Sequence, residues 1–235
     1  MRIDQNMAMA DVLLKYPGLI PFLSRFGIRL GFGNKTVNEI CSENRVNTAL
    51  FLEISNSCAD PDYEPSENLG TIAISDLVSY IRNTHRVYTE KELPAVEKEI
   101  STLLNGSSLG TEQRKLLTDF FTDYKNEFIR HIRHEEEVVI PYILDLEKKA
   151  SGEASDPERF RGFSILQYAR EHDRLEKSLN DLAVLIIKYL PPFSDQDLCN
   201  KILTMMFSLE HDLIEHAKLE DRVLVPRVLE LETRR

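Results

Sequence analysis

Two short stretches of the sequence each place a histidine and a glutamate four residues apart. The pairs are His131 with Glu135 and His216 with Glu220, and they repeat at an offset of 85 residues. Seven of the seventeen positions that start at each histidine are identical. Because residues i and i+4 lie above one another on one face of an α-helix, each pair aims an imidazole and a carboxylate at the same point. A helix presents two ligands to a metal ion in this way, so the repeat predicts a metal site.

Four long segments carry apolar residues at steps of three and four, which is typical of amphipathic helices. The segments are roughly residues 71–103, 111–148, 158–190 and 195–232. One histidine falls within the apolar stripe of each: His85, His131, His172 and His216. Pro141 and Pro226 each follow a repeated histidine by ten residues, and we expect them to kink or end their helices. The pattern predicts an all-α fold, an up-down-up-down four-helix bundle.

The four histidines are expected at one level of that bundle. With short loops, each lies about 14 to 17 residues from the same end, or roughly 21–26 Å at a rise of about 1.5 Å per residue. The separation of 46 residues between His85 and His131 nearly matches the 44 residues between His172 and His216. A duplicated helix hairpin would produce this similarity.

Histidines and glutamates that face a bundle core together predict a dinuclear metal centre. Carboxylates buried without partners cost roughly several kcal/mol each, and a pair of cations offsets that cost. Imidazole and carboxylate suit iron or manganese, so we expect two iron ions with an oxo or hydroxo bridge, manganese being the alternative. The expected terminal ligands are His85, His131, His172 and His216, and the expected bridging ligands are Glu135 and Glu220. Open coordination positions would take dioxygen, nitric oxide or peroxide.

Other polar residues near these stripes have simpler interpretations. His134 flanks the stripe and is a weaker ligand candidate. Asp212, one turn before His216, is a candidate acceptor for an imidazole N–H. Tyr88 and Tyr124 are expected to pack in the core with partners for their hydroxyls. The acidic residues beside the two glutamates are expected on solvated faces: Glu136, Glu137 and Asp221.

Composition limits the class of partner and the compartment. The net charge of −10 argues against nucleic acid or an anionic membrane surface as a partner. The N-terminus lacks the apolar stretch of a signal peptide, and nothing reaches transmembrane length. Cys41, Cys58 and Cys199 form no Cys-x-x-Cys pair, which indicates a reduced, cytoplasmic compartment. The sequence leaves open whether the chain forms a homodimer.

Changes in composition along the chain indicate three parts. Residues 1–58 have the pattern of a small helical N-terminal module, in which prolines split short apolar stretches. Residues 59–70 are polar and contain two prolines, which is typical of a linker. Residues 71–235 then contain the four long helical patterns of the bundle.

At the histidines and glutamates the sequence resembles the hemerythrin-like HHE cation-binding family. The matching motifs are Thr84-His85-Arg86-Val87-Tyr88 through Leu93-Pro94, His131-x3-Glu135-Glu136-x4-Pro141, Glu171-His172-Asp173 and His216-x3-Glu220-x5-Pro226. The resemblance covers about residues 70–232 and implies a four-helix bundle with a non-haem di-iron centre. Hemerythrins proper supply five histidines and two carboxylates. Four histidines in register therefore imply a site more open to an exogenous ligand.

The N-terminal module resembles the small domain that precedes this bundle in the iron–sulfur cluster repair di-iron proteins. That domain has a phrase of the type Gly-Ile-Asp-Phe-Cys-Cys-Gly-Gly before a short helix. The matching stretch here is Gly27-Ile28-Arg29-Leu30-Gly31-Phe32-Gly33-Asn34-Lys35-Thr36. The glycine turn is kept, but Gly31 and Phe32 stand where the family has its two cysteines. Cys41 lies some ten residues further on and is expected to be a buried core thiol.

These observations lead to three hypotheses for function. The first is a non-haem di-iron protein of the oxidative or nitrosative stress response, which binds or reduces a small oxidant or supports the repair of damaged iron–sulfur proteins. The second is a sensor or binding module that takes up dioxygen or nitric oxide reversibly, which the missing cysteine pair favours. The third is a structural bundle without metal. No constellation supports a Ser/His or Cys/His nucleophile, and the sequence leaves open whether the protein is an enzyme.

Overall fold

The computed structural model describes residues 2–60, 62–64, 72–107, 109–155, 160, 162–171 and 175–233. Every regular element in these ranges is helical; they contain no β-strand, only an isolated antiparallel bridge between Ala8 and Thr36. The predicted all-α fold is therefore confirmed. Within the same ranges, no helix is both long enough and apolar enough to cross a membrane.

The chain divides into two compact units. The first contains Met1–Thr84, Ile140–Ile165 and Lys218–Arg235, and the second contains His85–Val139 and Leu166–Ala217. Helices α5 (Ile74–Val87) and α11 (Gln196–Leu219) contribute residues to both units. The boundaries expected from composition, residues 1–58, 59–70 and 71–235, stay a prediction.

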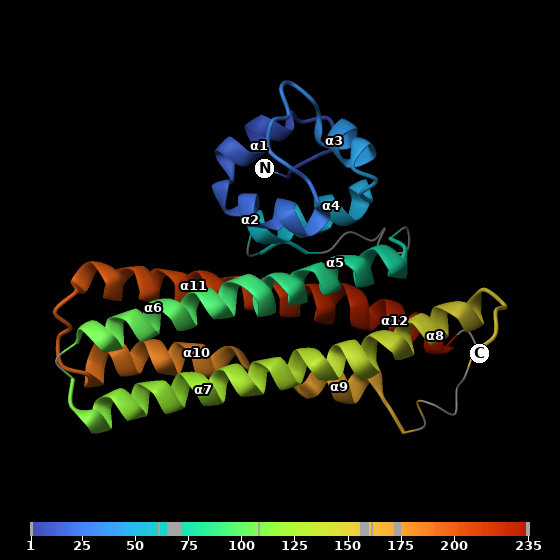
Figure 1. The fold of residues 1–235 in the computed structure, drawn as a ribbon. Helices are drawn as coiled ribbons and strands as arrows, with labels where there is room; N and C mark the ends of the chain where they lie inside the picture. The colour runs from blue at the N-terminus through green and yellow to red at the C-terminus, as the bar shows by residue number, and fades with distance from the viewer. Residues whose placement is uncertain are drawn as a thin grey trace. The chain divides into compact units, whose positions relative to one another are not determined.

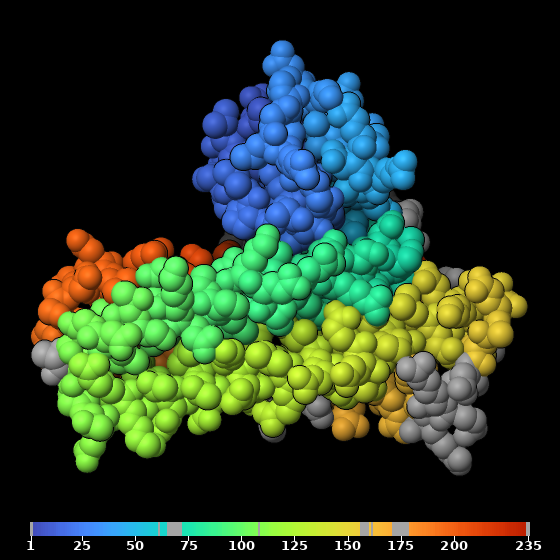
Figure 2. Space-filling view, in the orientation of Figure 1, coloured from blue at the N-terminus to red at the C-terminus, as the bar shows by residue number. Residues whose placement is uncertain are grey.

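The N-terminal helices of the first unit are short, and two of them begin at side-chain caps. They are α1 (Met9–Lys15), η1 (Pro17–Leu19), α2 (Ile20–Leu23), η2 (Ser24–Phe26), α3 (Val37–Glu43) and α4 (Thr48–Ala59). Thr36 and Glu39 form a capping box at the start of α3, in which each side chain accepts the backbone N–H of the other residue. The Asn47 side chain caps α4 by accepting the N–H groups of Ala49 and Leu50. The space-filling view shows the side chains of α1–α4, in blue, packed together (Figure 2).

An apolar core holds these short helices together. Its buried members are Ile3, Met9, Val12, Leu13, Leu19, Leu23, Ile28, Phe32, Val37, Ile40, Cys41 and Phe51. Gly31 has a φ of 114°, a backbone conformation that favours glycine, and it turns the chain so that Phe32 enters this core. Cys41 is a buried core thiol, as predicted, and its burial raises its pKa to about 11.

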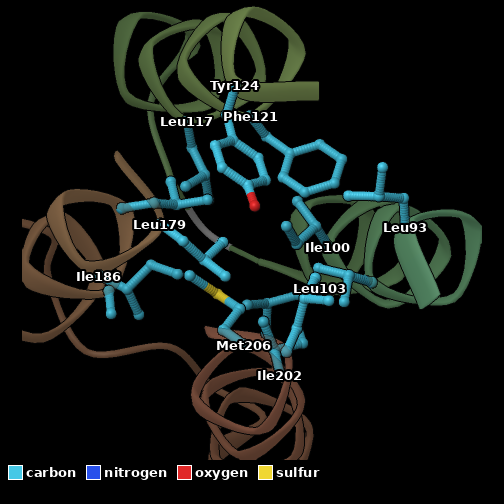
Figure 3. Packing of buried hydrophobic residues seen from close by; sticks show 14 of the residues in the cluster. Leu93, Ile100, Leu103, Leu117, Phe121, Tyr124, Leu179, Ile186, Ile202 and Met206 are labelled. Carbon is cyan, nitrogen blue, oxygen red and sulfur yellow. The ribbon is translucent and has the colours of Figure 1, made fainter. Parts of the chain in front are cut away.

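Four helices of the second unit enclose a separate apolar core. The helices are α6 (Leu93–Gly106), α7 (Thr111–His134), α10 (Leu175–Val184) and α11. Within this unit the chain reverses direction between α6 and α7 and again between α10 and α11, which makes two antiparallel hairpins (Figure 1). Their side chains meet between the helices (Figure 3), including Ile100, Leu103, Leu117, Phe121, Tyr124, Leu179, Ile202 and Met206. Amphipathic periodicity thus turns one face of each helix inward.

Within the described residues, the long helices contain four π-helical segments. They are η4 (Tyr88–Glu92), η5 (Glu135–Val139), η8 (Leu185–Tyr189) and η9 (Glu220–Leu224), of which η8 ends its helix. The remaining α-helices are α8 (Ile140–Ala150), α9 (Ile165–Glu171) and α12 (Val225–Thr233). Three π segments directly precede an α-helix whose second residue is proline: Pro94, Pro141 and Pro226. A proline has no N–H and its ring clashes with the carbonyl four residues earlier, so the wider π turn accommodates it. Pro141 and Pro226 therefore do not end their helices, and the expected alternative, a kink, stays a prediction.

Candidate metal centre

Two histidines and two glutamates come together where these helices change from α to π. His85 lies near the end of α5, Glu135 begins η5, His216 lies in the last turn of α11, and Glu220 begins η9. Each offers one ligand atom, and the four atoms all lie within 4.8 Å of one another. Three of these side chains are buried, and His216 is half-buried. The structure thus brings together four of the six predicted ligands, whose role as ligands stays a prediction.

Glu135 is in contact with three side chains from three helices. Its Oε2 lies 3.0 Å from Nε2 of His85, and its Oε1 lies 2.8 Å from Nε2 of His131. The Tyr168 hydroxyl donates to the same Oε1 at 2.7 Å. The glutamate is only 1% exposed, so these groups replace the water that a carboxylate would otherwise bind.

His85 is held at both ring nitrogens. Its Nδ1 lies 2.8 Å from Oε1 of Glu136, and its Nε2 faces Glu135. A proton on Nδ1 donated to Glu136 is the tautomer that leaves the Nε2 lone pair available to a metal ion. The expectation that Glu136 lies on a solvated face is wrong: its side chain is 31% exposed and hydrogen-bonded to His85. The acidic residue after the glutamate in both copies, Glu136 and Asp221, was the available signal.

His216 packs against two aromatic rings. Its ring centroid lies 5.2 Å from that of His85 and 5.7 Å from that of Tyr88, both nearly edge-on. The Tyr88 hydroxyl donates to the backbone carbonyl of Asp212 at 3.2 Å, so the expected partner for this hydroxyl is confirmed. A contact of the Asp212 carboxylate with an imidazole stays a prediction. The rings give this part of the site an apolar wall.

The two remaining predicted histidine ligands are His131 and His172. His131 contacts Glu135 through Nε2, but it is 22% exposed and lies outside the group of four. His172 lies outside the described residues. His134, the weaker candidate, is exposed.

Tyr168 was missed by the reasoning from sequence. It lies on α9, is 4% exposed, and contacts Glu135 directly. It precedes His172 by four residues in the sequence. That spacing, the same as in the His/Glu pairs, was the available signal.

The expected hydroxyl partner of Tyr124 is not found among the described residues. The hydroxyl is buried with no hydrogen-bond partner there, and it points into the apolar core of the second unit (Figure 3). Burial, together with the charge of Glu210, raises the pKa of Tyr124. The expectation therefore finds no support among the described residues, where aliphatic and aromatic side chains pack around this position.

The chemistry of the four converging side chains fits a metal ion. Glu135 and Glu220 are both buried, and two carboxylates this close repel one another unless positive charge lies between them. Imidazole nitrogen and carboxylate oxygen are ligands of intermediate hardness that suit iron and manganese. The group is therefore suited to hold a metal ion by its donors, its burial and its charge.

A buried His/Glu group in an all-α bundle defines the class as a helical metal-binding protein. The family model of the hemerythrin HHE cation-binding domain matches residues 77–228. This range is more than half of the chain and includes all four converging residues. The chain therefore belongs to the hemerythrin HHE cation-binding family. A comparison with curated proteins found no match.

Proposed function

We propose that this protein is a non-haem di-iron protein that binds or reduces a small oxidant, namely dioxygen, nitric oxide or peroxide. The observation that carries the proposal is the convergence of His85, Glu135, His216 and Glu220 within 4.8 Å, inside the matched range of the family. Iron suits this donor set, with manganese as the alternative. His131 and His172 would complete a set of six ligands.

Bound iron would supply a change of oxidation state and open coordination positions for a small ligand. The chain's own residues orient its ligands and exclude water. Glu136 fixes the tautomer of His85, and Tyr168 holds Glu135. The buried ring of Tyr88 lies edge-on to His216 and closes that side of the site to water.

We further propose that this chemistry serves the oxidative or nitrosative stress response in the cytoplasm. The three cysteines are free thiols, which supports a reducing compartment. A role in the repair of damaged iron–sulfur proteins rests on the resemblance of the N-terminal module. A homodimer is compatible with either role.

Reversible uptake of dioxygen or nitric oxide without turnover is the second candidate. Gly31 and Phe32, which stand in place of the family's cysteine pair, form a turn and fill the core. The nearby Cys41 is fully buried, and its pKa of about 11 keeps it protonated at neutral pH. This part of the module therefore offers packing rather than thiol chemistry, which favours a sensor or binding module.

Metal analysis of anaerobically purified protein, combined with an optical spectrum, tests the proposal. We expect two iron ions per chain and a spectrum that changes on titration with nitric oxide and with air. Protein that folds but takes up no metal, even when iron or manganese is supplied, would contradict it.

The two roles differ in the fate of the ligand after it is added to the iron-loaded protein. A nitrosyl or oxygenated form that releases its ligand unchanged indicates a binding module. Recovery of activity by a damaged iron–sulfur enzyme, on addition of the iron-loaded protein, indicates repair. Iron-loaded protein that restores no activity would remove the repair role and leave the di-iron centre intact.

A further inference from the structure

Tyr168 lies against the metal centre without belonging to the predicted ligand set. We infer that Tyr168 is a positioning residue, which holds Glu135 through a hydrogen bond and tunes the reduction potential of the bound metal. The inference rests on the proposed function, because it concerns how the chain supports a metal at this site.

The contact has the geometry of a strong hydrogen bond. The distance of 2.7 Å between the Tyr168 hydroxyl and Oε1 of Glu135 is typical of a hydroxyl donor and within the range for a charged acceptor. Both residues are at least 96% buried, so water does not compete for either partner. A phenol is neutral near pH 7 and can only donate to a carboxylate there.

Tyr168 differs from the two histidines that also contact Glu135. His85 and His131 face the carboxylate through Nε2, the atom each would offer to a metal ion. An imidazole whose Nε2 lone pair binds a metal no longer has a proton there to donate. Of these three contacts, only the one from Tyr168 keeps its donor when the site is loaded.

A persistent hydrogen bond to one oxygen of Glu135 has an electronic consequence. It withdraws electron density from the carboxylate and makes it a weaker donor to a metal, which favours the lower oxidation state. It also restricts the rotation of the carboxylate. Tyr168 should therefore raise the reduction potential of the centre and narrow the range of its metal–ligand geometry.

The test compares Tyr168→Phe with wild-type protein, both full-length and loaded with iron. We expect the variant to keep two irons and a folded structure, but to show a lower midpoint potential and shifted visible absorption. Tyr124→Phe is the matched control, because it removes a buried hydroxyl that points into the apolar core. The control should leave both the potential and the spectrum unchanged.

A second variant keeps the inference testable if Tyr168→Phe fails to fold or to retain iron. A ring-fluorinated tyrosine introduced at position 168 preserves the shape and donates a stronger hydrogen bond. We expect it to shift the midpoint potential upward, opposite to the phenylalanine variant. A potential that does not respond to fluorination would overturn the inference.

The remaining outcomes are also decisive. An unchanged potential in iron-loaded Tyr168→Phe overturns this inference and leaves the proposed function intact. A phenolate-to-iron charge-transfer band in the wild type that Tyr168→Phe removes makes Tyr168 a ligand and overturns its role as a donor. Wild-type protein that takes up no iron overturns the proposed function and, with it, this inference.

Discussion

The two copies of the His/Glu motif share their spacing but differ in their surroundings. In the first copy, Glu135 is contacted by His131 of its own helix and by His85 and Tyr168 from elsewhere. In the second, His216 packs edge-on against the rings of His85 and Tyr88. The helix itself provides each pair, whereas neighbouring helices provide further contacts to it. Polar contacts from two other helices are described for the glutamate of the first copy, and ring contacts are described for the histidine of the second.

Glu135 should be the most sensitive position, because three side chains depend on it. We expect Glu135→Ala to abolish iron binding, because it removes the buried carboxylate that His85 and His131 face. The iron content of the purified variant measures the effect. Glu137→Ala, which replaces an exposed acid in the same π segment, is the control and should keep its iron. Iron retained by Glu135→Ala would place the metal elsewhere.

Alanine substitutions of the two motif histidines should differ in how much iron binding they remove. His216 belongs to the group of four, whereas His131 lies outside it and is partly exposed. We expect His216→Ala to lose more iron than His131→Ala, because His131 contributes at the margin of the site. Equilibrium titration of the metal-free variants with ferrous iron under nitrogen compares them. Equal losses would mean that the two copies are equivalent in the loaded protein.

The acidic residue directly after Glu135 should support the site through His85. Glu136 is hydrogen-bonded to His85, whereas Glu137, the next residue of the same π segment, is exposed. We expect Glu136→Gln to weaken metal binding by about tenfold, the lower end for losing an outer partner of a ligating histidine. Glu137→Gln is the matched control and should alter the affinity far less. The same titration detects the difference, and equal effects would mean that the contact with His85 does not support the metal.

The smallest expected effect lies in the apolar core, away from both motifs. Tyr124→Phe removes a buried hydroxyl that has no hydrogen-bond partner among the described residues. We expect the variant to gain roughly 1 kcal/mol of stability, because an unsatisfied buried donor is costly. Thermal or urea denaturation of the metal-free protein measures the change. A loss of stability instead would show that the hydroxyl has a partner, such as a buried water.

Periodicity and spacing predict the features that belong to single helices, namely the all-α fold and the inward faces, which result from steps of three and four residues. The approach of His85, Glu135, His216 and Glu220 needed one further step, the equal heights of these residues in a bundle with short loops. Individual hydrogen bonds between helices were harder to predict. The bond from Glu136 to His85 spans 51 residues, and that from Tyr168 to Glu135 spans 33. Each depends on the rotation of two helices about their axes, which periodicity defines only coarsely.

The π segments changed the expected local geometry for a related reason. An α-helical pattern places successive side chains about 100° apart, and a π turn departs from that rule. Here η5 and η9 begin at the two glutamates, and each precedes a proline. The prolines are visible in the sequence, but their effect is absorbed by a wider turn rather than by the end of the helix.

A π turn also lets the number of residues in a helix change without rotating the side chains that follow it. It accommodates one more residue than an α-helical turn and leaves the helix beyond it facing as it would without the extra residue. Elsewhere in a helix, the loss of one residue rotates every later side chain by about 100°. The loss of one residue within Glu135–Val139 or Glu220–Leu224 should thus be absorbed locally, so that α8 and α12 keep their orientation while the chain becomes shorter beside the glutamates.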